Sequence, residues 1–389
     1  MSNGAADTFK KNAINAENAQ ANPSKRIRAG IVGVGWIARA HIESYLRCPD
    51  VDLVALAELN PGKAEALIKT LGIEDRGIRV YASAKEMYET EHLDIVSVCT
   101  SSAYHASSSI EALEAGVHVL CEKPMCTTLD EAVAMVRAAR KADRLLSIGF
   151  QPRMSKYMRD IVRVVQSGEL GEIYYLQAGG GRRHGIPTPF GTSFIQKETA
   201  GYGAMGDIGC YSLDMLLNAV GYPKPLTVSA YTSDFFGKDP SYYTGHPEYA
   251  EKFNVDDFAA AFIRLEGGII LDFRISWAMH MDTTGDALIL GKKGGLKIPS
   301  TECWNGSGGG PLTIYHEVAG KMVETRLPYE EEDVGELLYA KVRAFVDAAA
   351  YGAELPCPGE QILYNQAILD GIARSAELGR EVEIAIPEL

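Results

Sequence analysis

The sequence lacks the features that indicate a membrane-bound or secreted protein. No window of its 389 residues approaches the roughly 18 consecutive apolar residues of a membrane-spanning helix. Residues 1–25 contain no apolar segment of a secretory signal, and their polar composition predicts a flexible arm. The seven cysteines form no CxxC pair, and their odd number favours free thiols over a disulfide framework or a zinc site. We therefore expect a cytoplasmic protein that binds neither a membrane nor a metal.

Basic residues are also scarce. Lys and Arg number 38 against 51 Asp and Glu, which leaves a net charge of −13. Nucleic-acid-binding domains present basic stripes, so this balance argues against a nucleic-acid partner. Hydrophobic residues make up 46% of the chain and charged residues 23%, an ordinary globular composition. A chain of this length exceeds one ordinary hydrophobic core, so we expect two domains.

Residues 26–149 alternate short apolar runs with helical stretches. Nearly continuous apolar strands indicate a parallel sheet with helices on both faces, which is the arrangement of an α/β Rossmann domain. The predicted helices span residues 37–47, 63–71, 104–115 and 129–142.

Residues 150–389 show a different pattern, because apolar and polar residues alternate with a period of two in several segments. This predicts an α+β domain with an open antiparallel or mixed sheet and helices on one face, which binds substrate and mediates oligomerisation. The pairs Gly267-Gly268 and Gly294-Gly295 are predicted to be hairpin turns. The predicted helices span residues 154–167, 206–220, 333–351 and 361–378.

A glycine-rich turn follows the first predicted strand. Gly33, Gly35 and Ala38 form a G-x-G-x-x-A variant of the dinucleotide fingerprint, whose glycines allow a tight turn and a close approach of the backbone to pyrophosphate. Such a turn also occurs by chance. Here Glu58 ends the second predicted strand at the expected distance, and a carboxylate there accepts ribose hydroxyls and repels a 2′-phosphate. The motif therefore predicts NAD rather than NADP.

Four further segments complete an ordered set of motifs: VCT followed by a histidine at 105, EKP at 122–124, GFQ at 149–151 and GYGAMGDIGCYSLD at 201–214. Together with the glycine motif, this set resembles the Gfo/Idh/MocA family of oxidoreductases, over a stretch from about residue 26 to residue 384. The resemblance implies a Rossmann domain followed by an open-sheet domain, and activity on a sugar-like substrate.

The resemblance also implies catalytic residues. Lys123 of the EKP segment would contact both the nicotinamide and the reacting hydroxyl. The family's second element is an Asp with a His four residues later; here it consists of Asp207 and Tyr211, as in the glucose–fructose oxidoreductase branch. A spacing of four places both side chains on one helical face. We predict that Lys123 and Tyr211 handle the proton and that Asp207 holds a substrate hydroxyl. A helix-capping Asp207 and a structural Tyr211 are the alternatives.

Other residues are assigned to binding. Each arginine has a solvated ion pair as its alternative, each histidine has a structural role, and Trp277 is expected in the core rather than against a sugar. The predicted cofactor-binding residues are Gly33, Gly35, Trp36, Ile37, Glu58, Thr100, His105, Glu122, Lys123 and Gln151. The predicted substrate-binding residues are Lys123, Arg153, Arg182, Arg183, Asp207, Tyr211 and His280.

The combined prediction is an NAD-dependent oxidoreductase that transfers a hydride between nicotinamide and a ring hydroxyl or ketone of a sugar, glycoside or cyclic polyol. The resemblance implies a homodimer or homotetramer formed through the open sheet face. Two alternatives remain: a glycoside-processing enzyme that recycles a tightly bound NAD in each turnover, and a non-catalytic sugar or NAD sensor. Intact Lys123 and Asp207 argue against the sensor.

Overall fold

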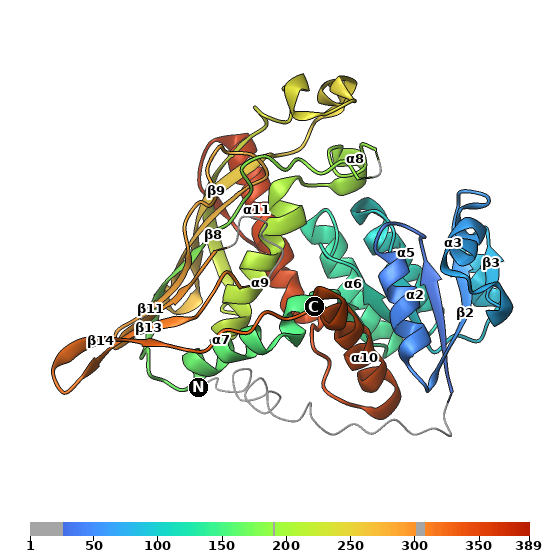
Figure 1. Cartoon of the computed structure of the whole chain (residues 1–389), viewed down its shortest axis with the longest axis horizontal. Coiled ribbons are helices and arrows are strands. Elements are labelled where there is room, and N and C mark those ends of the chain that lie inside the picture. Colours follow the sequence, from blue (N-terminus) through green and yellow to red (C-terminus); the bar gives the residue numbers. More distant parts are fainter. Residues whose placement is uncertain (1–25, 190, 301–307) are drawn as a thin grey trace. The chain divides into compact units, whose positions relative to one another are not determined.

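The computed structural model describes residues 26–189, 191–300 and 308–389, which form two compact units (Figure 1). Of the described residues, unit 1 contains those up to Met125 together with Ala134–Gln151 and Asp333–Gly359. Unit 2 contains Cys126–Val133, Pro152–Glu332 and Glu360–Leu389. The polar arm predicted for residues 1–25 lies outside the described residues.

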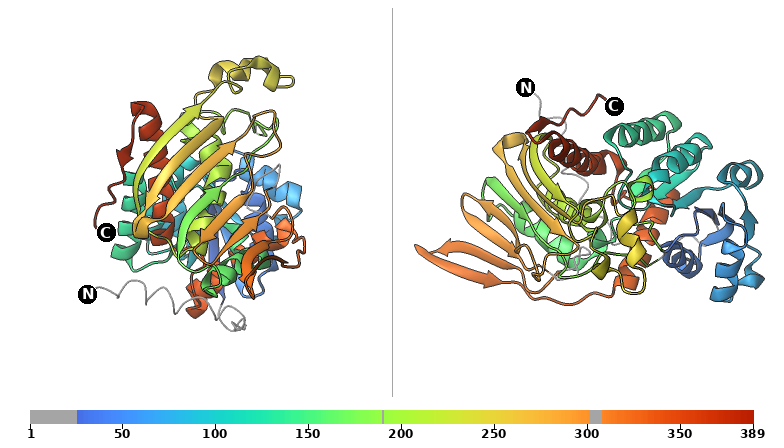
Figure 2. Two further views of the ribbon diagram at one scale, coloured as in Figure 1. Left: turned by 90° about the vertical axis from the view of Figure 1, so that its left-hand side faces the viewer. Right: turned by 90° about the horizontal axis from the view of Figure 1, so that it is seen from above.

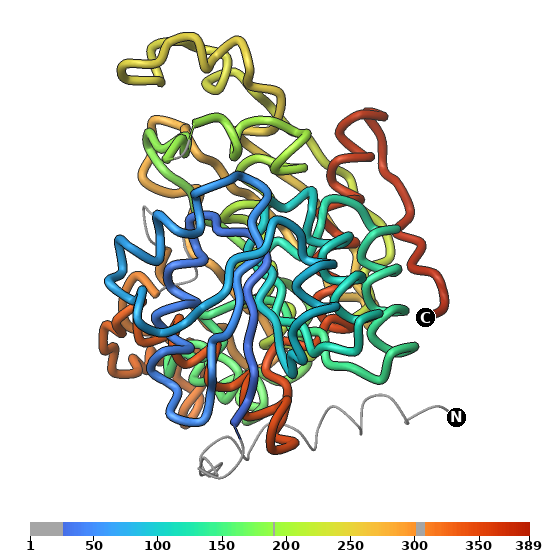
Figure 3. Tube along the Cα trace, turned by 90° about the vertical axis from the view of Figure 1, so that its right-hand side faces the viewer, coloured from blue at the N-terminus to red at the C-terminus, as the bar shows by residue number. Residues whose placement is uncertain are grey.

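Unit 1 is built on a six-stranded parallel sheet with the order β3-β2-β1-β4-β5-β6. This is the strand order of a doubly wound dinucleotide-binding fold, so the Rossmann prediction is confirmed. Figure 3 shows the blue strands β1 and β2 of this unit side by side. The strands are β1 (Ile27–Val32), β2 (Val51–Ala57), β3 (Arg79–Tyr81), β4 (Ile95–Val98), β5 (His118–Cys121) and β6 (Leu146–Ile148).

Helices connect these strands. Two predicted spans, 63–71 and 129–142, agree with the structure at both ends, whereas the short β3 and the helix after it were not predicted because three residues carry little periodic signal. The helices of this part are α2 (Ala38–Arg47), α3 (Lys63–Leu71), α4 (Ala84–Thr90), α5 (His105–Glu114) and α6 (Leu129–Ala142).

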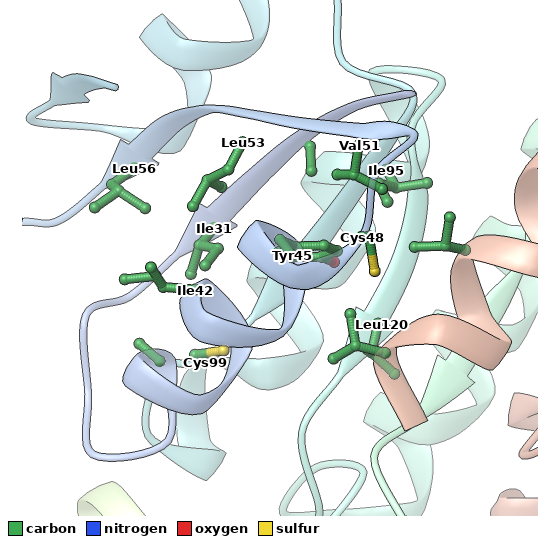
Figure 4. Packing of buried hydrophobic residues seen from close by; sticks show 14 of the residues in the cluster. Ile31, Ile42, Tyr45, Cys48, Val51, Leu53, Leu56, Ile95, Cys99 and Leu120 are labelled. Atoms are coloured by element: carbon green, nitrogen blue, oxygen red, sulfur yellow. The ribbon is translucent and has the colours of Figure 1, made fainter. Parts of the chain in front are cut away.

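A late helix, α10 (Val334–Tyr351), also belongs to unit 1. Its Val342, Phe345 and Val346 are fully buried in the same core cluster as α2 and strands β1 and β2. Figure 4 shows part of this cluster, with Tyr45 of α2 packed among aliphatic side chains. The change from one unit to the other after Gln151 lies close to the predicted division, but residues 333–359, predicted in the second domain, belong to unit 1. An apolar helix pattern does not say which sheet the helix covers.

Unit 2 contains a nine-stranded sheet with the order β14-β13-β12-β11-β7-β10-β9-β8-β15. It is mixed, since β7 and β10 are parallel and the other neighbours are antiparallel. The strands are β7 (Ile173–Ala178), β8 (Pro225–Ser233), β9 (Phe258–Leu265), β10 (Ile270–Ser276), β11 (Ala287–Gly291), β12 (Gly294–Ile298), β13 (Thr313–Val318), β14 (Lys321–Arg326) and β15 (Val382–Glu383).

The two predicted glycine turns have different outcomes. Gly267 and Gly268 both have positive φ and connect β9 to β10, as predicted. Gly294 and Gly295 instead lie inside β12. A Cβ on Gly294 would come within 2.8 Å of the carbonyl oxygen of Tyr315, so close packing explains that glycine.

Helices cover one face of this sheet. They are α7 (Lys156–Gln166), α9 (Cys210–Ala219) and α11 (Gly359–Leu378), with the short α8 (Lys197–Ala200) in the long loop before α9. Figure 2 shows the strands of the opposite face toward the viewer in its left panel. Along β9, Ala259, Ala261 and Ile263 are buried under the helices, whereas Phe262 and Arg264 are exposed on the other side. No helix of the described chain is long and apolar enough to cross a membrane.

Replacement of Phe345 tests the packing of α10. Phe345→Ala should lower the free energy of unfolding by about 3–5 kcal/mol, because a fully buried ring is removed and a cavity remains. Urea unfolding followed by fluorescence measures this. Glu336→Ala on the same helix removes an exposed ion pair with Arg47 and should change the free energy of unfolding by less than about 1 kcal/mol. Equal effects of the two variants would contradict the packing described here.

Candidate active site

The turn between β1 and α2 brings the backbone close to the next strand. Gly33 has a φ of 82°, and a Cβ there would come within 2.7–2.8 Å of Thr100. A Cβ on Gly35 would lie 2.9 Å from the carbonyl oxygen of Cys99. Both positions therefore require glycine, and the predicted fingerprint has the geometry expected of a dinucleotide loop.

The N-terminus of α2 has an open, anion-binding character. No side chain of the described residues caps this end of the helix. Uncapped N–H groups and the helix dipole favour a phosphate at such a position. Trp36 is 62% exposed in the turn and Ile37 is half-buried, and their assignment to cofactor binding stays a prediction.

Glu58 follows β2 and bonds to the same loop. Its carboxylate accepts hydrogen bonds from the backbone N–H of Val34 at 2.8 Å and from that of Asn60 at 2.9 Å. Burial opposes ionisation, but these bonds, that from the Asn60 side chain and the charge of Lys63 hold the pKa of Glu58 below its usual value. A carboxylate that is ionised at neutral pH at this position suits ribose hydroxyls and disfavours a phosphate.

Thr100 and His105 lie on the next loop of unit 1. The Thr100 hydroxyl is buried and has no hydrogen-bond partner among the described residues, so it is available to bond a ligand at this loop. His105 is buried, with Nδ1 2.7 Å from the carbonyl oxygen of Pro124 and Nε2 3.1 Å from that of Thr100. We infer that His105 joins two loops rather than contacting the cofactor. Together with the glycine cradle, the orphaned hydroxyl shows that these residues fit a dinucleotide.

The EKP segment follows β5. Lys123 is half-buried and joined to Pro124 by a cis peptide bond. Glu122 was predicted to contact the cofactor, but its buried carboxylate instead pairs with Lys341 of α10 and with His41 of α2. Burial opposes its ionisation, yet Lys341 and His41 outweigh burial and hold the pKa of Glu122 well below its usual value. This geometry favours a structural role for Glu122.

Asp207 and Tyr211 lie in unit 2. Asp207 belongs to a π-helical turn, Met205–Gly209, that runs directly into α9, and Tyr211 is buried in the first turn of α9. Turns of this kind occur frequently at functional sites. The Trp277 indole N–H donates to Asp207 Oδ2 at 3.0 Å, and Arg182 Nη2 lies 4.0 Å from the same oxygen. Trp277 is fully buried, as predicted, but it also holds the proposed substrate-binding carboxylate.

Asp256 fixes the segment that carries Asp207. Its carboxylate accepts the backbone N–H of Gly203 at 2.7 Å and that of Met205 at 2.8 Å. A Cβ on Gly203 would come within 1.8 Å of the Asp256 carbonyl oxygen, so this close approach needs glycine. Burial raises the pKa of Asp256 to about 6, although both backbone bonds favour the ionised form. The glycines around residue 207 therefore reflect tight packing of this helix start.

Of the remaining predicted residues, Arg153, Arg183 and His280 belong to unit 2. Gln151 is buried and is the last residue of the segment Ala134–Gln151 of unit 1. Arg153 forms a buried ion pair with Asp214 at 2.7 Å, not the solvated pair considered as its alternative, and we infer a structural role for it. Arg183 and His280 are exposed, and the carbonyl of Arg183 accepts the backbone N–H groups of Met279 and His280.

His280 belongs to an aromatic cluster with Phe236, Tyr242 and His184 that the sequence did not indicate. The rings of His184 and Tyr242 stack at 4.2 Å between centroids. Among the described residues, no group of three or more His, Cys, Asp or Glu side chains is arranged to hold a metal ion.

Residues outside the predicted set also shape the site. Trp277 and Asp256 hold Asp207 and its helix, and Lys341 and His41 hold Glu122. Of these four residues, only Trp277 had a signal in the sequence for a role at the site, because it lies close to the predicted substrate-binding His280. Nothing in the local pattern connects Lys341 with Glu122, because 219 residues separate them.

Comparison with protein families gives two matches. The model GFO_IDH_MocA, described as "Oxidoreductase family, NAD-binding Rossmann fold", matches residues 27–150. The model GFO_IDH_MocA_C3, described as "GFO/IDH/MocA C-terminal domain", matches residues 158–297. The two matches fall on the predicted Rossmann domain and on most of the sheet of unit 2.

Individual relatives are consistent with these matches. D-glucoside 3-dehydrogenase of Escherichia coli (strain K12) is 28% identical over 364 residues, which cover 93% of this chain and 98% of the relative. Levoglucosan dehydrogenase of Pseudarthrobacter phenanthrenivorans is 27% identical over 51% of this chain and 52% of its own length. A solved structure of levoglucosan dehydrogenase with NADH and levoglucosan superposes with a TM-score of 0.75 at 21% identity, over 92% of this chain and 100% of that chain. This last likeness shows the fold.

Glu58 gives a testable cofactor preference. NAD+ should bind at least roughly tenfold more tightly than NADP+, because a 2′-phosphate would meet the ionised Glu58 carboxylate and like-charge contacts cost several kcal/mol. Calorimetric titration of both cofactors measures this, and Glu58→Ser should narrow the difference. Glu65→Ser on the exposed side of α3 serves as the matched control and should leave the ratio unchanged. Equal affinities in the unmodified protein would remove Glu58 from the ribose site.

Proposed function

Because this chain belongs to the GFO/IDH/MocA family of NAD-binding oxidoreductases, we propose that it oxidises or reduces a ring hydroxyl or ketone of a sugar, glycoside or cyclic polyol. The observation that carries the proposal is that the proton-handling Lys123 and the substrate-binding Asp207 both lie in defined structural surroundings. Lys123 follows β5 of unit 1, at the carboxyl end of the parallel strands where ligands bind in open α/β sheets. Asp207 lies in a π-helical turn of unit 2 and is held by Trp277.

The residues have separate roles in this proposal. Bound NAD+ supplies a hydride acceptor when the substrate is oxidised. Loss of hydride from a carbinol carbon requires removal of the hydroxyl proton, and Lys123 Nζ takes that proton. The Tyr211 hydroxyl donates a hydrogen bond or relays the proton, because a phenol is a weak base at neutral pH.

Asp207 binds and orients the substrate. An ionised carboxylate offers about four acceptor positions, so it can hold the Trp277 indole and a sugar hydroxyl at the same time. Arg182 lies beside the same carboxylate, and its buried Nε has no hydrogen-bond partner among the described residues. A guanidinium with an available donor suits paired sugar hydroxyls.

The substrate class follows from the relatives. Their names refer to a glucoside and to levoglucosan, both of which carry ring hydroxyls on a sugar. We propose the same class for this chain. We also propose a cytoplasmic location, supported by the free thiols of Cys48, Cys99 and Cys121, which suit a reducing compartment.

A substrate screen tests the function. The purified protein is incubated with NAD+ and with aldoses, methyl and aryl glycosides, anhydrosugars and inositols, while the absorbance of NADH is followed. Continuous NADH formation with at least one sugar or polyol is expected. Turnover of a glycoside without free NADH would instead support the recycled-cofactor alternative. Failure to convert any member of these classes in either direction would overturn the proposed activity.

Two substitutions test the proton-handling residues. Lys123→Ala should lower kcat by at least about 10²-fold, the usual contribution of a general acid–base group, while NAD+ affinity changes far less. Tyr211→Phe keeps the ring and removes only the hydroxyl, so a lowered kcat with an unchanged melting temperature supports the relay. Near-normal turnover of Tyr211→Phe would return Tyr211 to a structural role. Full activity of Lys123→Ala would show that the site is misplaced.

We further propose that the face of the unit 2 sheet opposite the helices forms a homo-oligomer interface. Phe262 is 44% exposed and Tyr231 is 53% exposed on this face. Between them and the centre of the sheet, Asp272 bonds to Arg274 and accepts the Tyr175 hydroxyl at 3.2 Å. Exposed aromatic residues on an uncovered sheet face are typical of an interface, and Arg274 is of a residue type that is also enriched there.

The assembly has its own test. Light scattering at micromolar concentration should give a mass that is a multiple of the 42.2 kDa chain, most simply two or four copies. Phe262→Glu should lower that mass, because it places a charge in the centre of the interface. Leu378→Glu, at an exposed position at the end of α11, should leave it unchanged. A monomeric mass for the unmodified protein would contradict this proposal.

A further inference from the structure

Three ionisable side chains, those of Glu122, Lys341 and His41, are in contact inside unit 1 at the start of the EKP segment. Lys341 of α10 pairs with Glu122 Oε1, and His41 Nε2 of α2 lies 2.8 Å from the same oxygen. The exposed fractions are 2% for Lys341, 0% for His41 and 6% for Glu122. We call these residues the Glu122 network. It joins the end of β5 to two helices that are distant in the sequence.

The hydrogen-bond directions follow from the chemistry of each group. An ionised carboxylate only accepts, so His41 Nε2 carries the proton and donates to Glu122. His41 Nδ1 then accepts from the Ser97 hydroxyl at 2.8 Å, and Ser97 Oγ accepts from the Tyr45 hydroxyl at 2.7 Å. The chain of donors runs from Tyr45 to Glu122, so His41 has one defined tautomer.

Glu122 is also fixed from the side of the EKP segment. Its Oε2 lies 3.3 Å from the backbone nitrogen of Lys123, which donates to it. A Cβ on Gly149 would come within 2.8 Å of Glu122 Oε1, so the backbone of residue 149 packs directly on the carboxylate. The orientation of the Glu122 carboxylate therefore depends on the position of the Lys123 backbone, and Lys123 is the residue proposed to handle the proton.

A purely stabilising role explains this arrangement poorly. Burial of two opposite charges is often no better for stability than well-packed apolar residues of the same size. A site that holds a catalytic group within fractions of an ångström needs supporting contacts of this kind. We propose that Lys341 and His41 are positioning residues that act through Glu122 to hold Lys123 in its working position. This rests on the proposed function, because it takes Lys123 as the proton-handling group.

The electrostatics of the network distinguish this role from simple packing. The ionisable groups that face Glu122 are Lys341 of α10, His41 of α2, Cys99 after β4, and Cys121, Lys123 and His105 around the EKP segment. Burial and the charge of Lys341 together lower the pKa of His41, so its imidazole is neutral at physiological pH. Lys341 is thus the cation that balances Glu122.

Removal of Lys341 should transfer that task to His41. In Lys341→Met, His41 still hydrogen-bonds the buried Glu122 carboxylate, and the charge of Lys341 no longer opposes its protonation. The pKa of His41 therefore rises above its value in the unmodified protein. Below that raised pKa, the imidazolium holds Glu122 in place. As the pH rises through it, the imidazole becomes neutral, and both the positioning and the stability it contributes are lost.

The experiment compares Lys341→Met, His41→Gln and the double variant with the unmodified protein from pH 5.5 to pH 8.5. At pH 8.5, kcat of Lys341→Met should be lower by roughly 10²-fold, the loss typical of a misplaced catalytic group, with NAD+ affinity little changed. The deficit should shrink toward pH 5.5. The double variant should keep its deficit at every pH, because no imidazole remains. The matched control is Arg343→Met, which breaks the ion pair of α10 with Asp50 without touching Glu122 and should retain kcat.

Two readouts do not depend on turnover. The His41 ring, followed by NMR in the protein without cofactor, should titrate at a higher pH in Lys341→Met than in the unmodified protein. The melting temperature of Lys341→Met should fall as the pH rises through that pKa, and that of the double variant should not show this step. If Lys341→Met does not fold, His41→Gln with Lys341 retained should still show a lowered kcat with unchanged NAD+ affinity.

The outcomes separate the two proposals. If the unmodified protein converts no sugar or polyol, the proposed function fails, and with it the role of Lys123. If it turns over but Lys341→Met or His41→Gln matches it in kcat, the positioning role is overturned and the activity stands. A deficit of Lys341→Met that is independent of pH would also overturn the exchange of counter-ions proposed here.

Discussion

The negative charge of Glu122 is buried at the end of β5, and a buried carboxylate requires a counter-ion and several donors. Lys341 meets this requirement from α10, which the chain reaches only after it has formed strands β7 to β14 of the unit 2 sheet. This explains why residues 333–359 return to the Rossmann unit. This segment also contributes to the hydrophobic core of unit 1, since Phe345 and Val346 of α10 belong to the same buried cluster as residues of α2. One electrostatic constraint thus links the topology of the chain to the segment that carries Lys123.

In unit 2, the position of Asp207 is fixed by hydrogen bonds rather than by a buried ion pair. The helix start that carries Asp207 is fixed by Asp256, which accepts two of its backbone N–H groups, and the carboxylate of Asp207 is held by Trp277. Both partners lie on or next to the strands of the mixed sheet. In each unit, a residue proposed to touch substrate is oriented by residues far away in the sequence. Such supporting contacts keep the geometry of a site reproducible.

Part of the site was predictable because its signals are local. The glycine motif, Glu58 and the EKP segment each follow a strand, and the carboxyl ends of parallel strands lie at one edge of a sheet. The structure places Gly33, Gly35 and Glu58 around one loop, as the motif predicts. The assignments of Glu122 and Arg153 to ligand contacts did not anticipate their buried ion pairs. A charged residue in a motif carries no information about its partner when that partner is 61 residues away, as for Arg153, or 219 residues away, as for Glu122.

The sequence by itself determined the fold class, the bounds of α3 and α6, and the dinucleotide turn, since these depend on periodicity and on glycine sterics within a few residues. Only the tertiary structure decided that α10 belongs to the Rossmann unit, that Gly294 and Gly295 lie inside a strand, and that Lys341 and His41 share the charge of Glu122. The physical reason is that packing and electrostatic pairing depend on distance in space. The pattern along the chain specifies which faces are apolar and which residues are charged, but not which of them meet.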